Sequence, residues 1–364
     1  MNQISNPQRP SLDDFKTRLE AYLGAEIQPP LVLASGWETT IYEFALSGPG
    51  RFIELRPGAR LVLRFYESSD GVLKGRREHR TITQLFQAGY PVPAPYLFEP
   101  SKQALGAPFL VMDRIAAGPL FSTRSLPQAF VTFSMAFASF VKAQVRLHRI
   151  SADLGGAGFF SDAAAPNGNP TPGIVTRRPL LDRMLDVIAD RIERGPLPGL
   201  ARALEILRDR APQFRDAPAS IVHLDYHPQN VLVSGARVKA VIDWVNADCG
   251  DRHLDAATTA VILATSAMDH PFWMRANPLG NSLRRIFTGL YIPLYHAMAP
   301  MDLARFRYCQ AVAAVMRLST LGMMKTRGAE SVGYRQASIA QVTPSVLRLL
   351  TRYATRKTGV ATTV

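Results

Sequence analysis

One stretch of the sequence, residues 223–255, constrains the chain more than any other. Asp225 and Asn230 stand five residues apart, and Asp243 follows after two runs rich in β-branched residues. These runs flank a Ser-Gly-Ala-Arg sequence, which predicts a β-hairpin with a short turn. In such a hairpin, the residue entering the first strand lies beside the residue leaving the second, so we expect Asn230 and Asp243 to be neighbours. Their oxygens, with Asp225 nearby, are hard ligands that suit octahedral Mg²⁺.

The spacing of Asp225 and Asn230 is that of protein kinase catalytic loops, which read H-R-D-x-x-x-x-N. In those loops the Asp accepts the proton of the substrate hydroxyl and the Asn holds a Mg²⁺ ion. The alternative interpretation is a surface loop and hairpin in which Asp and Asn only cap turns. Three polar residues at the right spacing, within a strand-turn-strand context, favour the kinase interpretation.

At these positions the sequence resembles the aminoglycoside phosphotransferase and choline kinase-like small-molecule kinases. Members of that family typically show a His-Gly-Asp-x-His-x-x-Asn loop, then Ile-Asp-Trp or Ile-Asp-Phe, then Gly-Asp-Pro and an Asp-Leu pair. The matching residues here are His223, Asp225, His227, Asn230, Ile242-Asp243-Trp244, Gly250-Asp251 and Leu254-Asp255. The sequence departs from the family at Leu224, where Gly is usual, and at Arg252, where Pro is usual.

The resemblance implies an α+β, protein kinase-like bilobal fold with an antiparallel-sheet N-lobe and a mainly helical C-lobe. We expect an N-terminal tail and helix in residues 1–25 and a nucleotide-binding N-lobe with its hinge in 26–118. Residues 119–364 are expected to form the C-lobe, with the catalytic loop and the acceptor site.

The resemblance also assigns roles to the motif residues, with ATP and Mg²⁺ as cofactors. Asp225 is the expected catalytic base, and Asn230 and Asp243 are the expected metal ligands. His223 and Asp255 are expected to brace the loop. His227 is expected to support the site or to line the acceptor pocket. Together with Asp225, these five residues make up the C-lobe half of the predicted site.

The N-lobe half of the site is predicted from residues 31–115. Residues 31–44 read as strand, turn and strand, with the small residues Ser35 and Gly36 at the turn where nucleotide phosphates lie in kinases. An ordinary hairpin is the alternative. No G-x-x-x-x-G-K-[ST] sequence is present, which excludes a Walker-type phosphate loop.

Arg64, in the next strand, takes the place of the kinase lysine that contacts the α- and β-phosphates. Glu78 is expected to begin a helix with an apolar face of Ile82, Leu85 and Phe86, and to pair with Arg64. The alternative for Arg64 is a surface charge at a strand edge. By resemblance, the backbone near Asp113 to Ile115 is the hinge that bonds adenine.

Other helices are predicted at 130–150, at 177–216 with a break at 195–199, and after Asp255 to about residue 355. His148 is interpreted as a structural histidine. Residues 161–174 are rich in Ala, Pro, Gly and Asn and predict a mobile loop. Residues 352–364 are expected to be frayed.

Composition narrows the class of protein. No apolar run reaches the roughly 18 residues of a spanning helix, no signal peptide is evident, and two cysteines give no disulfide framework, so we expect a cytoplasmic protein. The net charge is +13, and from Ala256 onward 13 basic residues face 3 acidic ones. Because polycationic ligands need acidic sites, this charge argues against a polycationic acceptor. The basic charge suits an anionic substrate, a membrane surface or a nucleic acid, and a merely solvated surface is the alternative.

The predicted function is therefore transfer of the γ-phosphoryl group of ATP to a hydroxyl group of a small molecule. A kinase-fold binding or regulatory protein with weak catalysis is the alternative. A protein kinase is disfavoured because Trp244-Val245 replaces Phe-Gly and no Ala-Pro-Glu follows. No specific nucleic-acid partner is expected. Five aromatic residues either wall the acceptor pocket or belong to the core: Phe272, Trp273, Tyr291, Tyr295 and Phe306.

Overall fold

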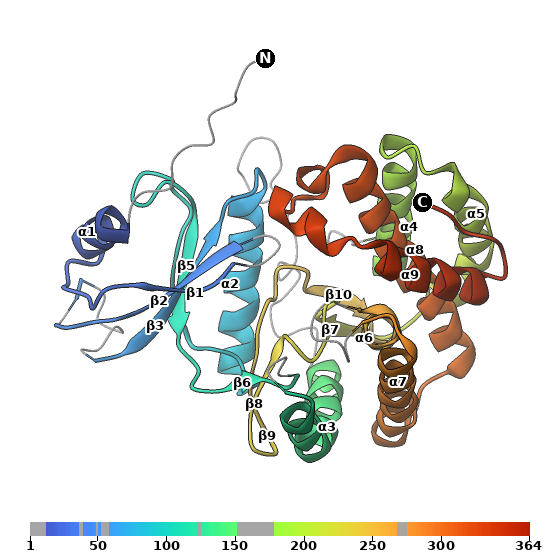
Figure 1. Cartoon of the computed structure of the whole chain (residues 1–364), viewed down its shortest axis with the longest axis horizontal. Coiled ribbons are helices and arrows are strands. Elements are labelled where there is room, and N and C mark those ends of the chain that lie inside the picture. The colour runs from blue at the N-terminus through green and yellow to red at the C-terminus, as the bar shows by residue number, and fades with distance from the viewer. Residues whose placement is uncertain are drawn as a thin grey trace.

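The computed structural model describes residues 12–35, 39–48, 50–51, 58–121, 125–150, 178–267 and 275–364. The chain forms two lobes (Figure 1), with a β-sheet lobe at the N-terminal end and a mainly helical lobe at the C-terminal end. The predicted bilobal α+β fold is confirmed. The proposed division at residues 25 and 118 stays a prediction.

The N-lobe is built on an antiparallel sheet in the order β1-β2-β3-β5-β4. Its strands are β1 (Leu31–Ser35), β2 (Thr39–Ala45), β3 (Arg60–Tyr66), β4 (Pro95–Glu99) and β5 (Phe109–Asp113). Helix α1 (Leu12–Leu23) packs Phe15, Leu19 and Leu23 into a cluster with the outer face of the sheet. Ser11, the predicted cap of this helix, lies outside the described residues.

Helix α2 (Gly71–Gln87) covers the other face of the sheet and lies between it and the C-lobe (Figure 1). The prediction that Glu78 begins this helix is wrong, because the helix starts seven residues earlier. Two glycines in its first turns let the helix lie close to the sheet, because a Cβ atom at Gly75 would collide with the ring of Phe98. Phe86 is 50% exposed, so it does not belong to the apolar face.

The catalytic motif is framed by short strands of the C-lobe. The predicted hairpin is confirmed as β8 (Val231–Ser234) and β9 (Arg237–Val241), joined by a two-residue turn in which Gly235 has a φ of +57°. That positive φ is readily adopted only by glycine. Strand β6 (Gly118–Pro119) leads from the N-lobe and pairs with β8. Strands β7 (Ala219–Val222) and β10 (Asp248–Asp251) pair on the other side of the motif.

Helices make up most of the C-lobe. They are α3 (Leu126–Arg149), α4 (Leu180–Arg194), α5 (Ala201–Arg210), α6 (Arg252–Thr265), α7 (Pro278–Met298), α8 (Leu303–Arg327) and α9 (Pro344–Thr358). Short 3₁₀ helices cover Pro198–Leu200, Ala211–Phe214, Ala329–Val332 and Gln336–Gln341. The predicted loop at 161–174 lies outside the described residues. None of the described helices is long and apolar enough to cross a membrane.

The predicted fraying of residues 352–364 is wrong. Helix α9 continues to Thr358, and the chain after it docks on the C-lobe. Thr362 is 2% exposed, and the Thr363 amide donates a hydrogen bond of 3.3 Å to the Gly199 carbonyl. Polar threonines gave no apolar signal in the sequence, but their hydroxyls bond to the backbone and to one another here.

Candidate active site

The catalytic loop lies between β7 and β8, and Asn230 holds Asp225 in place. The Asn230 Nδ2 atom donates to the Asp225 carbonyl at 3.0 Å and to its Oδ2 atom at 3.2 Å. The Nε2 atom of His227 lies 3.6 Å from the same Oδ2 atom. Burial raises the pKa of Asp225, but the nearby charges of His227, His223 and Arg317 outweigh it, so the pKa lies below its usual value. Asp225 is therefore a carboxylate at neutral pH.

Asp243 meets Arg64 across the two lobes. The Ile242 amide donates to the Asn230 carbonyl at 2.9 Å, which keeps the two predicted metal ligands next to each other at the open end of the hairpin. The Arg64 Nη2 atom lies 2.7 Å from Asp243 Oδ1. Arg64 is 4% exposed, which rules out the surface-charge alternative. Burial lowers the pKa of Arg64, but the charges of Asp243 and Glu78 raise it by more. The pKa therefore lies above its usual value, and the guanidinium keeps its charge.

Glu78 joins three elements through one buried carboxylate. It accepts hydrogen bonds from Arg64 Nη1 at 3.1 Å, the Tyr66 hydroxyl at 2.6 Å and the Trp244 amide at 3.1 Å. Burial raises the pKa of Glu78, and the charge of Arg64 opposes that shift. The predicted pairing of Arg64 with Glu78 is present. Tyr66 was missed by the sequence analysis, although it lies two residues after Arg64 on the same face of β3.

The side chain of Trp244 anchors the turn that carries Asp243. It is fully buried, and its indole N–H donates to the Val241 carbonyl at 2.9 Å. His223 adds a second connection: its Nε2 atom donates to the Ile242 carbonyl at 3.0 Å, while its Nδ1 atom accepts from the Asp225 amide at 3.3 Å. His223 therefore joins the catalytic loop to the hairpin, as its predicted bracing role requires.

Asp255 supports the catalytic loop from inside the C-lobe. It is fully buried, and its Oδ1 atom accepts a hydrogen bond of 2.6 Å from the Leu224 amide. Its Oδ2 atom accepts from Gln144 at 3.0 Å and from His148 Nε2 at 2.8 Å. Burial raises the pKa of Asp255, but these donors and charges lower it below its usual value. Nothing in the sequence marked Gln144, which comes from α3.

The structure assigns three of the five aromatic candidates to the core. Tyr291 and Tyr295 are fully buried, and Phe306 is 3% exposed. The Tyr291 hydroxyl donates to Gln144 at 2.6 Å, and the Tyr295 hydroxyl shares a 2.6 Å hydrogen bond with His148 Nδ1. His148 is thus the structural histidine that was predicted. Phe272 and Trp273 lie outside the described residues.

Leu224 stands where the family usually has glycine, and its backbone explains that preference. Its φ is +60°, a left-handed conformation that strains residues with a Cβ atom by about 1–2 kcal/mol. Asp243 is also left-handed, with a φ of +70°. Aspartate tolerates this conformation better than leucine does. The hydrogen bond from the Leu224 amide to Asp255 helps to hold Leu224 in this conformation.

This strain predicts an unusual order of stability between two variants. Leu224→Ala loses the packing of the side chain and keeps the strain, whereas Leu224→Gly loses the packing and removes the strain. We expect the glycine variant to be more stable than the alanine variant by about 1 kcal/mol, the reverse of the order in helices or strands. Urea unfolding of the two variants measures this difference. Alanine as the more stable variant would contradict a left-handed Leu224.

The hinge and the phosphate turn are only partly described. The amides of Asp113 and Arg114 donate to the carbonyls of Ala94 and Arg60, both at 2.9 Å, so they are engaged within the N-lobe. The Ile115 carbonyl accepts from the Ala117 amide at 2.9 Å. Ser35 ends β1. Gly36 lies outside the described residues, and its predicted contact with phosphates stays a prediction.

The donor atoms of the site fit Mg²⁺ carried by a nucleotide. Asn230 donates through its nitrogen, which leaves its amide oxygen to act as a ligand, and Asp243 has a second carboxylate oxygen beside the one that Arg64 holds. No group of three or more His, Cys, Asp or Glu side chains within the described ranges forms a metal centre. A magnesium ion here depends on phosphate oxygens and water for its remaining ligands, as is usual for Mg²⁺.

Comparison with known proteins decides the family. A family model described as "Phosphotransferase enzyme family" matches residues 31–300, which is most of the chain. The chain belongs to this family. The phosphotransferase motifs His223 to Asp255 and the N-lobe residues Arg64 and Glu78 all lie inside the matched range.

Solved phosphotransferase structures share the fold. A putative aminoglycoside phosphotransferase from Ralstonia eutropha superposes with a TM-score of 0.62 at 17% identity, over 93% of this chain and 98% of its own. Aminoglycoside phosphotransferase APH(4)-Ia, in a ternary complex with ADP and hygromycin B, gives 0.57 at 17% identity over 91% and 98%. Macrolide 2'-phosphotransferase type I gives 0.57 at 15% identity over 98% and 100%.

One curated relative is much longer than this chain. It is acyl-CoA dehydrogenase family member 11 from Gallus gallus, 28% identical over 183 residues. The match covers 50% of this chain and 22% of that protein.

Proposed function

We propose that the chain is an ATP-dependent phosphotransferase that moves the γ-phosphoryl group to a hydroxyl group of a small molecule. One observation carries the proposal: a base, Asp225, and two oxygen ligands, Asn230 and Asp243, lie together and face a buried guanidinium, Arg64, from the opposite lobe. Phosphoryl transfer depends on positioning and charge stabilisation, and this arrangement provides both.

Each residue has one task in the proposed reaction. Asp225 orients the acceptor hydroxyl and takes its proton while the hydroxyl oxygen bonds to the γ-phosphorus and the bond to the ADP oxygen breaks. Arg64 binds the α- and β-phosphates, and Asn230 and Asp243 would hold Mg²⁺. Bound magnesium supplies positive charge that offsets the negative charge of the phosphates. Because the neighbouring amides are engaged, we assign the adenine contact to the Ile115 amide.

The competing function is that of a kinase-fold binding protein with weak catalysis. The presence of the base, both ligands and the Arg64–Glu78 pair argues for catalysis. The names of the structural relatives point to aminoglycoside and macrolide acceptors. The basic balance after Ala256 favours an acceptor that is not polycationic.

An ATP-consumption screen against hydroxylated metabolites and antibiotics tests the proposal. The blank is Asp225→Asn, and the matched control is Asp209→Asn, which changes an exposed carboxylate on α5. We expect at least one compound to stimulate ADP formation by the wild type and the control but not by the blank. Binding of ATP without turnover of any compound would favour the binding protein instead.

A further inference from the structure

Arg317, on α8, has almost no partner although part of it is buried. Its Nε atom is buried and makes no hydrogen bond, and its Nη2 atom lies 3.5 Å from the Ser266 hydroxyl, beyond the usual range. Within the described part of the chain, no carboxylate pairs with it. Two half-buried arginines of the same lobe do pair with carboxylates: Arg183 binds Asp248 at 2.6 Å and Arg305 binds Asp251 at 3.1 Å. A buried donor without an acceptor is unfavourable unless a ligand supplies one.

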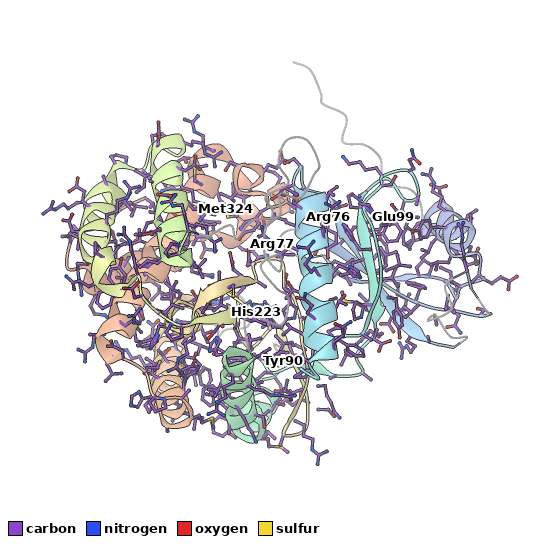
Figure 2. The ribbon with its side chains drawn as sticks, turned by 180° about the vertical axis from the view of Figure 1, so that it is seen from behind. Arg76, Arg77, Tyr90, Glu99, His223 and Met324 are labelled. Carbon is purple, nitrogen blue, oxygen red and sulfur yellow. The ribbon has the colours of Figure 1, made fainter. Side chains whose placement is uncertain are left out.

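Arg317 lies on the elements that support the catalytic loop. Helix α6 runs beneath that loop, because Thr259 donates to the Tyr226 carbonyl at 2.8 Å. Ser266 caps the C-terminal end of α6, and its hydroxyl lies 3.5 Å from Arg317 Nη2. Figure 2 shows His223, at the start of that loop, within the C-lobe.

Arg317 and Arg64 come from opposite lobes. Arg64 comes from the N-lobe and is held by Asp243, on the side assigned to the nucleotide. Arg317 comes from the C-lobe, where the acceptor is expected. Arg284, which is 6% exposed, donates to the Ser266 carbonyl at 3.3 Å and adds a second positive charge at this end of α6.

We infer that Arg317 binds an oxyanion, a carboxylate or a phosphate, carried by the hydroxyl acceptor. This inference rests on the proposed phosphotransferase function and names its substrate class. An arginine presents a planar fork of donors that matches both oxyanions. Its charge also offsets the repulsion between an anionic acceptor and the Asp225 carboxylate, and it repels a polycationic acceptor.

Matched pairs of acceptors test the inference by isolating the oxyanion. The pairs are 3-hydroxybutyrate with its neutral methyl ester, and glycerol 3-phosphate with glycerol; kanamycin serves as the cationic compound. We expect the wild type to favour the anionic member of one pair by roughly 10- to 100-fold in kcat/KM, the usual effect of a charged hydrogen bond. The pair in which the anionic member is favoured shows whether Arg317 binds a carboxylate or a phosphate. Preference for the neutral members or for kanamycin overturns the inference.

Variants of Arg317 give the second arm. Arg317→Met should lower kcat/KM for the anionic member of the responding pair far more than for its neutral partner, and Arg317→Lys should keep part of the anion preference. Arg307→Met, an exposed arginine on the same helix, is the control. Equal losses for both members of a pair would mean a structural role only and would overturn the inference.

A binding measurement separates this inference from the proposed function. Calorimetry with protein loaded with Mg²⁺ and AMP-PNP uses the same four compounds as probes, whether or not any is phosphorylated. Tighter binding of the anionic members that Arg317→Met abolishes supports the inference even where turnover is absent. Binding that does not depend on Arg317 overturns it, even where the wild type turns over some other compound.

Discussion

Asp225→Asn is expected to lower turnover by about 10³-fold or more while ATP affinity changes by less than about threefold. Asparagine has the same shape as aspartate but cannot accept the proton of the acceptor hydroxyl, and a general base contributes roughly 10²–10⁴-fold. Asp225 carries its negative charge at neutral pH, so the variant also removes the charge that orients the hydroxyl. Initial rates of ADP formation and calorimetric ATP titrations measure the two quantities.

The Asp225→Asn experiment has a matched control variant and an outcome that would contradict the prediction. Asp209→Asn removes an exposed carboxylate of the same lobe and should leave both quantities unchanged. Because Asn230 donates to the Asp225 carbonyl as well as to its side chain, the loop should keep its shape in the variant. Wild-type turnover by Asp225→Asn on a verified acceptor would remove Asp225 from the mechanism.

Asp255→Ala is expected to lower the free energy of unfolding by about 3–5 kcal/mol. The variant leaves the Leu224 amide, the Gln144 amide and the His148 ring without their shared acceptor in the interior of the C-lobe. Asp255→Asn should lower the free energy of unfolding by less, because its amide oxygen still accepts one of these hydrogen bonds. Urea unfolding monitored by circular dichroism measures both values.

The pH dependence of the Asp255 effect has a definite sign. The pKa of Asp255 is lower in the fold than its usual value of 3.8, so its contribution to stability is fully present above about pH 4. That contribution falls as the pH drops through the folded pKa. The stability gap between the wild type and Asp255→Asn should therefore narrow below pH 3.8. A gap that stays constant between pH 7 and pH 3 would show that the carboxylate is not stabilised in its charged form.

The convergence of the three candidate catalytic and metal-binding residues could be predicted because its information is local. Asp225, Asn230 and Asp243 lie on one loop and one hairpin, where spacing and turn residues determine geometry. Asp255 was expected to brace that loop, but its own partners could not be predicted, because they come from far along the chain. Asp255 meets Gln144 and His148 more than 100 residues away, and nothing in the sequence linked either residue to Asp255.

One prediction was wrong and one choice stayed open, for different physical reasons. The start of α2 was missed because Gly71 and Gly75 disfavour helix, yet their small size is what lets the helix approach the sheet. Tyr291 and Tyr295 were ambiguous because an aromatic ring with a hydroxyl suits a pocket wall and a polar core equally well. The distinction depended on Gln144 and His148, which bond to the two hydroxyls.

The buried indole beside Asp243 has a consequence for regulation. In protein kinases, the packing of the aromatic residue after the metal-binding aspartate distinguishes active from inactive states. Here, moving that ring outward would expose about 200 Å² of apolar surface, which costs about 5 kcal/mol. It would also break the hydrogen bond that the Trp244 amide donates to Glu78. A switch of this kind is therefore unfavourable in this chain. For the proposed phosphotransferase, we expect the rate to follow the supply of nucleotide and acceptor and not the position of the Trp244 ring.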